Sequence, residues 1–432
     1  MPDFKTVRGM RDFLPEPTMK LKVIEKKARR IAQLYGYSEV ITPILESYEL
    51  LTSKIGEEIR SRMYAFKDLG GRNVALRPEF TASIARLAST TLRTWPKPLR
   101  IFCAGRLYRY DEPQHGRFRE FWQANYELLG SSRPEADAEI MLLANDFLKK
   151  LGLKNFSFKI GHVNVLKEIL KQEEVEEPTI NKIMHLMDKR QYNKTLNLLR
   201  KNETTNLCSR TIEELVKIQG RTSSEIMEKM EQSVEKYKKA VNAIDNLKQI
   251  LELVMNVDEN INIKVEPGFA RGLEYYTGMI FEIFVPEMNI ALGGGGRYDK
   301  LIELFGGEPT PAVGVAPGLD RIFLATEKQK IIVAKRKQKK LIVIPVQNEL
   351  IIEATKVAHT IREAGIPIQV EVMGRNMTKA LEDADRRQKD YAIILGDKEL
   401  REGKMVIRDL KKRTQQTIKM EKLAEFLGKT LS

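Results

Sequence analysis

Residues 99–129 read LRIFCAGRLYRYDEPQHGRFREFWQANYELL, and this stretch says most about the fold. Its two ends, Leu99–Arg109 and Phe118–Leu129, are rich in apolar and aromatic residues, which is typical of β-strands. Between them, Asp111–Gly116 contains Pro113 and ends in glycine, as turn regions do. The stretch therefore predicts two strands joined into a hairpin by a longer loop.

The second strand of this hairpin carries a polar face. Side chains alternate between the two faces of a strand, so Arg119, Gln123 and Glu127 lie on one face, with Arg117 at its edge. The first strand ends its own apolar face with Arg109. Arginine binds phosphate oxygens, and a carboxylate can bind an ammonium group or an imidazole N–H. The face suits a zwitterion beside a polyphosphate, and a solvent-facing sheet surface is the alternative.

A second polar group lies upstream, in the stretch from Arg77 to Thr81. The stretch precedes a helical pattern, for which Pro78 suits the first turn and Thr81 suits an N-cap. Capping of the helix is one interpretation. In the other, Glu79 binds an ammonium group of a ligand.

Two glycine-containing stretches follow much later in the chain. Arg271–Gly278 precedes apolar Met279–Val285, which predicts a loop leading into a central strand, where a phosphate would be a partner for the arginine. Gly293–Gly296 lacks the spaced glycines, the following helix and the acidic residue of a dinucleotide-binding fingerprint. We therefore exclude dinucleotide binding and expect another backbone or a small substrate to lie close to these glycines.

Arg321 lies in the first turn of a helix that is expected to begin near Pro317–Gly318. A cation at this position opposes the helix dipole. A bound phosphate would compensate, and so would an ordinary ion pair with Asp320 or Glu303.

The regions around these motifs differ in composition and in the spacing of their apolar residues. Near the N-terminus, Lys20–Tyr35 predicts a helix and Tyr37–Pro43 a short strand. Residues 166–256 are rich in Lys and Glu with spaced apolar residues, which predicts several amphipathic helices inserted into a catalytic core. A role of these helices in gripping a partner is the alternative.

A basic linker at residues 327–340 precedes a region in which strands alternate with helices. This alternation predicts a mostly parallel sheet in a separate α/β domain. The expected strands are Leu341–Val346, Ile366–Val372, Tyr391–Leu395 and Lys404–Asp409, and the expected helices are Asn348–Ala364, Thr378–Gln388 and Met420–Leu427.

Composition excludes several classes of protein. The chain has 432 residues, of which 42% are hydrophobic and 31% charged, which is ordinary globular usage. No apolar run approaches the roughly 18 residues that cross a bilayer, and the polar N-terminus does not resemble a secretory signal, so we expect a soluble, cytoplasmic protein without a membrane partner. Cys103 and Cys208 cannot form a disulfide framework, and four histidines form no zinc motif.

The formal net charge is 73 − 59 = +14. An acidic partner such as a nucleic acid would explain this excess, and a lysine-rich solvated surface would explain it equally well. No Ser/His/Asp arrangement and no Walker lysine loop is present.

Together, these segments resemble the histidyl-tRNA synthetases, a family of class II aminoacyl-tRNA synthetases. The matching segments are Gly9–Pro15 (the N-terminal signature), Tyr37–Pro43 (the dimer motif), Arg109–Glu127 (motif 2), Gly318–Arg321 (motif 3), and Arg271–Gly278 and Gly294–Asp299 (the two histidine-specific signatures).

The resemblance implies an α/β protein with an α+β catalytic domain, built on an antiparallel sheet flanked by helices. It assigns residues 1–165 and 257–326 to this catalytic domain, 166–256 to a helical insertion domain, 327–340 to the basic linker and 341–432 to an α/β anticodon-binding domain. It also implies a homodimer with histidine-specific tRNA as its partner.

The same resemblance implies that histidine reacts with ATP to form histidyl-adenylate, before transfer of histidine to the tRNA. Arg109 and Arg271 would be the catalytic residues, and Mg²⁺ would be held mainly by ATP. The implied contacts are Arg109, Arg117 and Arg321 with ATP; Glu79, Thr81 and Gln123 with the α-amino and carboxylate end of histidine; Glu127 and Tyr276 with its imidazole; Tyr275 and Tyr298 as pocket walls; and Arg271 with both the histidine carboxylate and the α-phosphate.

Asp111 departs from the commonest bacterial pattern of motif 2 and resembles archaeal and eukaryotic members instead. Glu274, Pro317 and Asp320 depart as well. In the motif 2 loop, Glu112 and His115 also depart, which leaves open how the tRNA's extra 5′ guanosine and its discriminator base are recognised; Gln114 is a candidate. One alternative is a synthetase-like regulatory subunit of ATP phosphoribosyltransferase, a class that typically loses the motif arginines and the anticodon domain. Another is a class II synthetase for a different amino acid.

Overall fold

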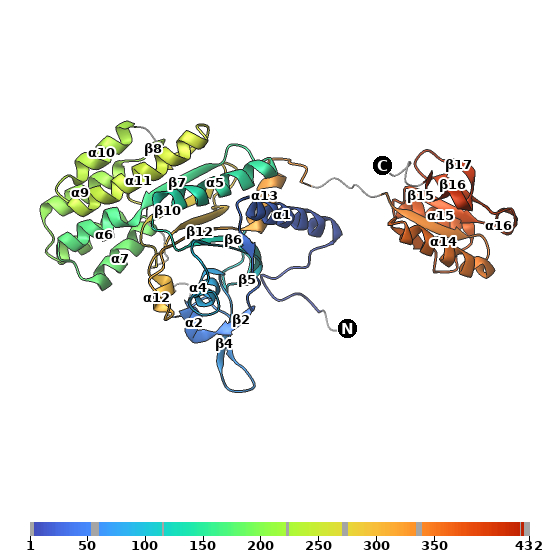
Figure 1. Ribbon diagram of the computed structural model, residues 1–432, viewed down its shortest axis with the longest axis horizontal. Helices are drawn as coiled ribbons and strands as arrows, with labels where there is room; N and C mark the ends of the chain where they lie inside the picture. Colours follow the sequence, from blue (N-terminus) through green and yellow to red (C-terminus); the bar gives the residue numbers. More distant parts are fainter. Residues whose placement is uncertain are drawn as a thin grey trace. The chain divides into compact units, whose positions relative to one another are not determined.

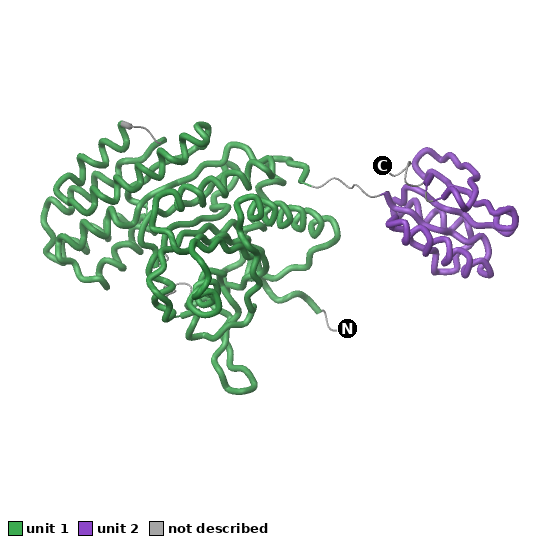
Figure 2. The backbone as a smooth tube through the Cα atoms, in the orientation of Figure 1, with its two compact units in different colours: residues 1–334 green, residues 335–432 purple. Residues whose placement is uncertain are grey.

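The computed structural model describes residues 4–52, 60–114, 116–221, 224–269, 275–333, 339–423 and 425–426. The chain divides into two compact units, residues 1–334 and 335–432 (Figure 2). Each unit has a buried apolar core of its own. In the described part of the chain, no helix is long and apolar enough to cross a membrane.

A large sheet forms the centre of the first unit (Figure 1). From β5 to β7, each strand is antiparallel to its neighbour, whereas β1 pairs with β5 and β9 with β7 in parallel. The expected antiparallel sheet is therefore confirmed. In spatial order the strands are β1 (Ser38–Glu39), β5 (Leu99–Tyr108), β6 (Glu120–Leu129), β12 (Ala312–Pro317), β11 (Gly293–Arg297), β10 (Met279–Phe284), β7 (Ser157–His162), β9 (Ile263–Val265) and β8 (Gly220–Arg221).

The predicted hairpin is the β5–β6 pair. Gly105 lies opposite Gln123 and Ile101 opposite Glu127, so the polar face of β6 and the apolar face that ends in Arg109 are one surface of the sheet. Both strands are slightly shorter than predicted, because the ladder ends at Tyr108. The predicted strand at Tyr37–Pro43 is shorter still, since only Ser38–Glu39 pairs with β5.

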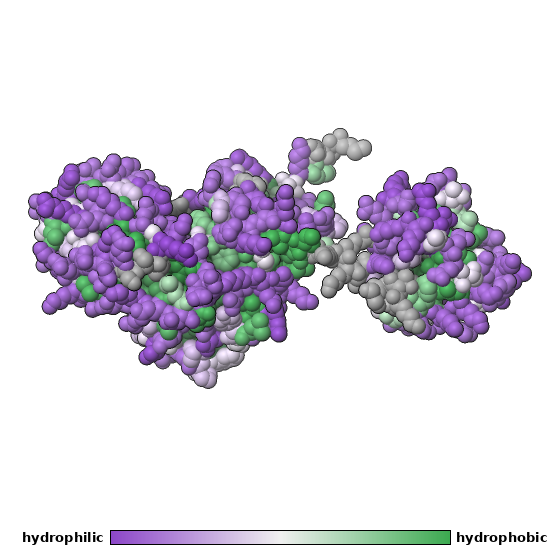
Figure 3. Space-filling model, turned by 90° about the horizontal axis from the view of Figure 1, so that it is seen from above, coloured by the Kyte–Doolittle hydropathy of each residue, from purple (hydrophilic) through white to green (hydrophobic). Residues whose placement is uncertain are grey.

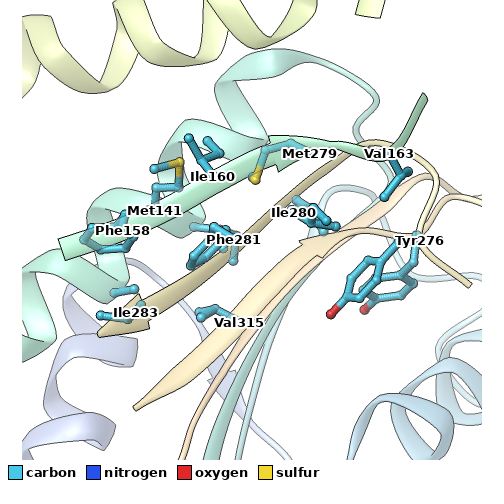
Figure 4. Packing of buried hydrophobic residues seen from close by; sticks show 14 of the residues in the cluster. Met141, Phe158, Ile160, Val163, Tyr276, Met279, Ile280, Phe281, Ile283 and Val315 are labelled. Atoms are coloured by element: carbon cyan, nitrogen blue, oxygen red, sulfur yellow. The ribbon is translucent and has the colours of Figure 1, made fainter. Parts of the chain in front are cut away.

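Helices cover this sheet and fix the position of its strands. Helix α1 (Pro15–Leu34) begins five residues before the predicted Lys20, because Pro15 already starts the first turn. Helix α5 (Pro134–Leu151) ends at Gly152, whose φ of +87° suits glycine at a helix C-terminus. Met141 of α5 lies beside Phe158 of β7, which packs against Phe281 of β10 at 5.7 Å between ring centroids (Figure 4). Helix α13 (Leu319–Lys328) begins where the sequence predicts.

A smaller sheet and three short helices lie beside the large sheet. The small sheet contains β2 (Leu45–Ser47), β4 (Asn73–Leu76) and β3 (Ala65–Lys67), and the β3–β4 hairpin projects from the body of the unit (Figure 1). The short helices are α2 (Tyr48–Thr52), α4 (Thr81–Ser89) and α12 (Leu301–Leu304).

The described residues from 163 to 257 form six helices and one short strand, and the amphipathic pattern predicts the helices. The helices are α6 (Val163–Gln172), α7 (Glu177–Asp188), α8 (Tyr192–Lys201), α9 (Asn206–Lys217), α10 (Ser224–Val234) and α11 (Lys238–Val257). The sequence did not predict the strand β8 in their midst. Because β8 pairs with β9 at the edge of the large sheet, it attaches this helical segment to the sheet.

The second unit contains a mixed five-stranded sheet among its described residues. Strands β14 (Ile368–Val370), β13 (Leu341–Pro345) and β15 (Tyr391–Leu395) are parallel, whereas β16 (Lys404–Asp409) and β17 (Thr414–Lys419) are antiparallel. The prediction of a mostly parallel sheet is therefore wrong for the last two strands. Strand β17 was missed because it is almost entirely polar and exposed.

The helices of this unit are α14 (Ile351–Glu363), which follows a 3₁₀ turn at Asn348–Leu350, α15 (Met377–Arg386) and α16 (Asp397–Arg401). The predicted helix Met420–Leu427 starts as a 3₁₀ turn, Met420–Lys422, and residues 424 and 427 lie outside the described residues.

Candidate active site

A pocket of about 300 Å³ opens on the large sheet of the first unit. It brings together side chains from β6, the start of α4, the residues just before β10, the end of β11 and the start of α13. Every predicted site residue except Arg271 lines it, namely Glu79, Thr81, Arg109, Arg117, Gln123, Glu127, Tyr275, Tyr276, Tyr298 and Arg321. Arg271 lies outside the described residues, as does Glu274.

Glu127 is the most deeply buried acid of this pocket, with 1% of its surface exposed. Its Oε1 accepts hydrogen bonds of 2.9 Å from the Thr81 hydroxyl and of 2.9 Å from the Asn125 amide, and its Oε2 accepts one from the Tyr298 hydroxyl. Burial raises the pKa of Glu127 to about 7, and these three donors oppose the rise. The carboxyl group is therefore poised between its acid and ionised forms near neutral pH.

This contact corrects one interpretation of Thr81. Its side chain does not cap α4, because its hydroxyl points to Glu127. The structure instead places Thr81 beneath the carboxylate.

Gly314 of β12 makes room for Glu127. The two residues lie opposite each other in the β12–β6 ladder. A Cβ atom on Gly314 would lie 2.5 Å from the carboxylate carbon of Glu127 and would overlap with Oε2. The pocket therefore requires glycine at this position.

Three tyrosines form a wall of the pocket. The ring of Tyr275 lies edge-on to Tyr298, at 5.7 Å between centroids, and 4.9 Å from Tyr276. The Tyr275 hydroxyl donates to Glu79 at 3.4 Å. Figure 4 shows Tyr276 just before the start of β10, and the main-chain carbonyl of this residue accepts a hydrogen bond from Lys167 of α6. The helical segment thus contacts the pocket directly.

Three arginines give the pocket a positive end. Arg321 is largely buried, and it donates to the carbonyls of Gly116 at 3.2 Å and Ala291 at 2.8 Å. Burial, together with the nearby charges of Arg109 and Arg117, lowers its pKa to about 10. Such a cluster of cations attracts an anion strongly.

Arg109 and Arg117 complete this positive end. Arg109 donates to the Pro78 carbonyl at 2.9 Å and lies over the Phe121 ring. Arg117 is exposed, at the mouth of the loop between β5 and β6, where it pairs with Gln114. Guanidinium groups of this kind can bind phosphate oxygens.

The structure excludes one interpretation of Arg119 and one of Asp320. Arg119 does not line the pocket, because the N-terminal segment covers it, with Gly9 against its side chain and Tyr110 beneath its guanidinium at 3.6 Å. Asp320 makes its ion pair with Arg11, so it is not the partner of Arg321.

The run of glycines at Gly293–Gly296 is strand β11 itself. A Cβ atom on Gly296 would lie 2.6 Å from the Met279 carbonyl, and one on Gly295 would overlap with the carbonyl oxygen of Gly314. As expected, other backbone segments lie close to these glycines. At the end of β11, Arg297 forms a buried ion pair with Asp137 that anchors the strand to α5.

Sequence reasoning missed several lining residues. Asn125 shares the face of Gln123 and Glu127, so the alternation of β6 was the signal that could have found it. Arg62, Asp188 and Glu282 reach the pocket from distant parts of the chain, and no sequence pattern indicated them.

The pocket therefore has two chemically different ends. Glu127, Glu79 and the tyrosines can hold a small ligand that donates hydrogen bonds, and Arg109, Arg117 and Arg321 can hold phosphates. An amino acid and a nucleotide bound together would meet between them. The described residues contain no group of three or more His, Cys, Asp or Glu side chains that could hold a metal ion.

Comparisons with known proteins agree with this geometry. A family model described as histidyl-tRNA synthetase matches residues 9–322, and one described as anticodon binding domain matches residues 340–430. A curated histidine–tRNA ligase of Methanocaldococcus jannaschii is 42% identical over 425 residues, which cover 98% of this chain and 99% of that protein. This archaeal relative fits the archaeal character of Asp111.

Solved structures share the fold at lower identity. A histidyl-tRNA synthetase from Nostoc has a TM-score of 0.77 at 22% identity and covers 100% of both chains. A Bacillus halodurans protein described as an ATP phosphoribosyltransferase regulatory subunit/histidyl-tRNA synthetase has a TM-score of 0.75 at 24% identity, covering 88% of this chain and 96% of its own. From the family models and the full-length relative, this chain belongs to the histidyl-tRNA synthetase family.

Proposed function

We propose that this chain joins L-histidine to the 3′ end of its cognate tRNA in two steps. Histidine first reacts with ATP to give histidyl-adenylate and pyrophosphate, and the terminal adenosine of the tRNA then takes the histidyl group. The observation that carries this proposal is the two-ended pocket, which sets a buried carboxylate network at one end and three arginines at the other.

At the histidine end, Glu127 and Tyr276 bind the imidazole nitrogens. Thr81, Asn125 and Tyr298 orient the Glu127 carboxylate through the three hydrogen bonds that it accepts. Because Thr81 is engaged in this way, we assign it to the support of the imidazole site. This is a change from the contact with the α-amino and carboxylate end that the resemblance implies.

The polar atoms of the histidine backbone lie closer to the middle of the pocket. Glu79 binds the α-ammonium group and Gln123 binds the carboxylate end. Tyr275, which donates to Glu79 and packs edge-on against Tyr298, forms a wall that excludes larger side chains.

At the nucleotide end, Arg109 binds the α-phosphate, Arg117 the terminal phosphates, and Arg321 the adenine and the γ-phosphate. Arg271 bridges the histidine carboxylate and the α-phosphate. The carboxylate of histidine then attacks the α-phosphorus in line with the leaving pyrophosphate. No protein nucleophile takes part. The activation barrier is lowered instead by the orientation of the two substrates and by the positive charge around the phosphates.

Mg²⁺ accompanies ATP in this scheme and neutralises charge on its phosphates. Asp111 and Glu282 line the pocket, and both carboxylates interact electrostatically with Arg321. As separate carboxylates, they fit a metal ion that is held mainly by the nucleotide. Asp111 also forms an ion pair with Arg62 at 3.2 Å.

Binding of tRNA uses both units. The second unit, matched by the anticodon-binding family model, recognises the anticodon. The helical insertion, residues 166–256, holds the acceptor stem, and the basic linker at residues 327–340 contributes positive charge to the binding of tRNA. A cytoplasmic location follows from this role in protein synthesis.

The working molecule is a homodimer. Strand β1 is the edge strand of the large sheet, and Ile41, two residues after it, is 93% exposed. Apolar patches interrupt a mostly hydrophilic surface (Figure 3). Further exposed apolar residues belong to the small sheet and its connections, namely Ile44, Leu45, Phe66 and Leu69. A second copy would cover such a surface, and light scattering at the mass of a single chain would contradict this assignment.

The regulatory subunit of ATP phosphoribosyltransferase is the weaker alternative. Arg109, Arg117 and Arg321 are placed together in the pocket, and the anticodon-binding unit is present. A regulatory protein has no need of either feature.

A charging assay tests the proposal. The purified full chain is incubated with ATP, Mg²⁺, transcribed histidine tRNA and labelled amino acids supplied one at a time. We expect label in the tRNA with histidine only. Charging with another amino acid, or with none, would contradict the proposed function.

A further inference from the structure

The N-terminal segment runs across the outside of the nucleotide end of the pocket. The amide of Arg119 donates to the carbonyl of Gly9 at 2.9 Å, and a Cβ atom on Gly9 would lie 2.7 Å from the Arg119 side chain. Two residues further on, Arg11 turns toward the pocket wall. The segment is thus fixed against the loop that follows β5.

Arg11 makes an unusual set of contacts for an N-terminal residue. Its guanidinium carbon lies 3.3 Å from the centroid of the Phe118 ring and 4.6 Å from that of Phe13. The same guanidinium forms an ion pair with Asp320. Arginine combines stacking and ion pairing in this way because its guanidinium is planar.

Asp320 connects Arg11 to two elements that line the pocket, helix α13 and strand β6. It is 3% exposed and belongs to the first turn of α13, one residue before Arg321. While Oδ1 accepts from Arg11, Oδ2 accepts a hydrogen bond of 2.5 Å from the main-chain amide of Trp122 in β6. One carboxylate therefore ties the start of α13 to β6, next to the bridge between Gln123 and Gly318.

The position of Arg321 depends on this connection, because its guanidinium lies among other positive charges. In the absence of phosphates, the charges of Arg109 and Arg117 repel it; burial first, and then these two charges, lower the pKa of Arg321. Its guanidinium donates to two neutral main-chain carbonyls, those of Gly116 and Ala291. The ionised form of Asp320 in turn depends on Arg11, because burial raises the pKa of this carboxyl group and the Arg11 charge lowers it.

We propose that Arg11 is a positioning residue for ATP: it holds Phe118 by stacking and holds Arg321 through Asp320. Phe118 and Arg321 both line the pocket, whereas Arg11 does not. The inference rests on the proposed function, in which Arg321 binds the adenine and the γ-phosphate. Loss of Arg11 releases both groups and weakens ATP binding without touching the histidine end.

The same segment offers a matched control. Arg8 also forms an ion pair, with Glu112 at 2.9 Å, but these side chains are 73% and 70% exposed. An exposed pair of this kind contributes little to stability. Removal of Arg8 therefore changes the charge of the segment equally but leaves the pocket wall in place.

The experiment compares Arg11→Met, Arg11→Lys and Arg8→Met in the full chain. Calorimetry measures the affinity for ATP alone, and ATP–pyrophosphate exchange measures the KM values for ATP and histidine. We expect Arg11→Met to weaken ATP binding and to raise its KM about tenfold or more, which is the order of one lost charged contact. The KM for histidine should stay within about twofold, and Arg8→Met should match the unaltered chain.

Arg11→Lys keeps the positive charge but loses the planar stacking on Phe118. Its affinity for ATP should therefore lie between those of Arg11→Met and the unaltered chain. A double variant, Arg11→Met with Asp320→Asn, should bind ATP no more weakly than the more affected single variant, since both act through one contact. Unchanged ATP affinity in Arg11→Met, equal changes in both KM values, or additive losses in the double variant would overturn the proposal.

If Arg11→Met does not fold, Arg11→Lys and Asp320→Asn carry the same comparison of the two KM values. Calorimetric binding of ATP does not require turnover. An absence of exchange with histidine in the unaltered chain would therefore count against the proposed function, whereas the calorimetric comparison tests Arg11 by itself.

Discussion

The carboxylate of Glu127 occupies the space in which Gly314 would otherwise carry a side chain. A Cβ atom there would lie 2.5 Å from the carboxylate carbon, and the two residues face each other across the β12–β6 ladder. The position of this buried acid thus depends on a glycine 187 residues away in the chain, which the sheet register places opposite it.

The first prediction follows from this contact. Gly314→Ala should push the Glu127 carboxylate away from Tyr298 and raise the KM for histidine about tenfold or more, because a charged hydrogen bond to the substrate is lost. The KM for ATP should change little. Steady-state exchange kinetics measure both values.

Gly70→Ala is the matched control, since Gly70 is exposed and its nearest neighbour is the flexible side chain of Asp68. An unchanged KM for histidine in Gly314→Ala would show that Glu127 does not depend on this space.

The second prediction concerns the pH dependence of stability. Burial raises the pKa of Glu127 from 4.5 to about 7, so between these values the carboxyl group ionises in the unfolded chain but not in the folded one. Its contribution to the free energy of unfolding is complete below the lower pKa and is lost as pH rises through the higher one. The loss is about 3 kcal/mol at most.

The glutamine side chain of the Glu127→Gln variant cannot ionise, so its free energy of unfolding lacks this pH-dependent contribution. We expect the unfolding free energy of the unaltered chain, measured relative to that of Glu127→Gln by denaturant titration without ligands, to fall between pH 5 and pH 8. Since the other titrating groups are common to both chains, parallel pH profiles would contradict the raised pKa.

The third prediction concerns Arg321, whose pKa is lowered to about 10 by burial and by Arg109 and Arg117. A lysine in the same place starts from a lower pKa and would titrate near pH 8 or below, at about the same shift. Arg321→Lys should therefore lose affinity for ATP as pH rises from 7 to 9, while the unaltered chain should not. Calorimetric ATP binding across that range measures this, and identical profiles would argue against the electrostatic description.

Local patterns predicted the elements that depend on neighbours in the sequence. The β5–β6 hairpin follows from alternation and turn residues within 31 residues, and the same alternation grouped Gln123 with Glu127. The start of α13 was predicted for the same reason. Strands β8 and β17 were not predicted, because two residues carry no periodicity and a polar edge strand carries no apolar signal.

The errors in the site have a different cause. Alternation placed Arg119 on the polar face, but the N-terminal segment covers it. Asp320 was weighed as a partner of its neighbour Arg321, whereas its partner Arg11 is 309 residues away. Such contacts depend on which segments the sheet order brings together, and a single sequence does not reveal that order.

The fourth prediction separates the two units. Each has its own apolar core, so a chain ending at residue 333 should retain histidine-dependent exchange while its KM for tRNA rises strongly.

For the full chain, tRNA affinity should fall steeply with salt, because phosphate contacts release counterions, and the KM for histidine should hardly change. Filter binding and exchange at several salt concentrations measure these effects, and equal losses of exchange and charging would contradict the division of roles.

Activation of histidine is measured most directly by amino-acid-dependent exchange of labelled pyrophosphate into ATP, in the presence of Mg²⁺ and without tRNA. We expect exchange with histidine and with no other amino acid, and loss of this exchange in Arg109→Ala and Glu127→Ala. Exchange that is supported by a different amino acid, or that persists in these variants, would contradict it.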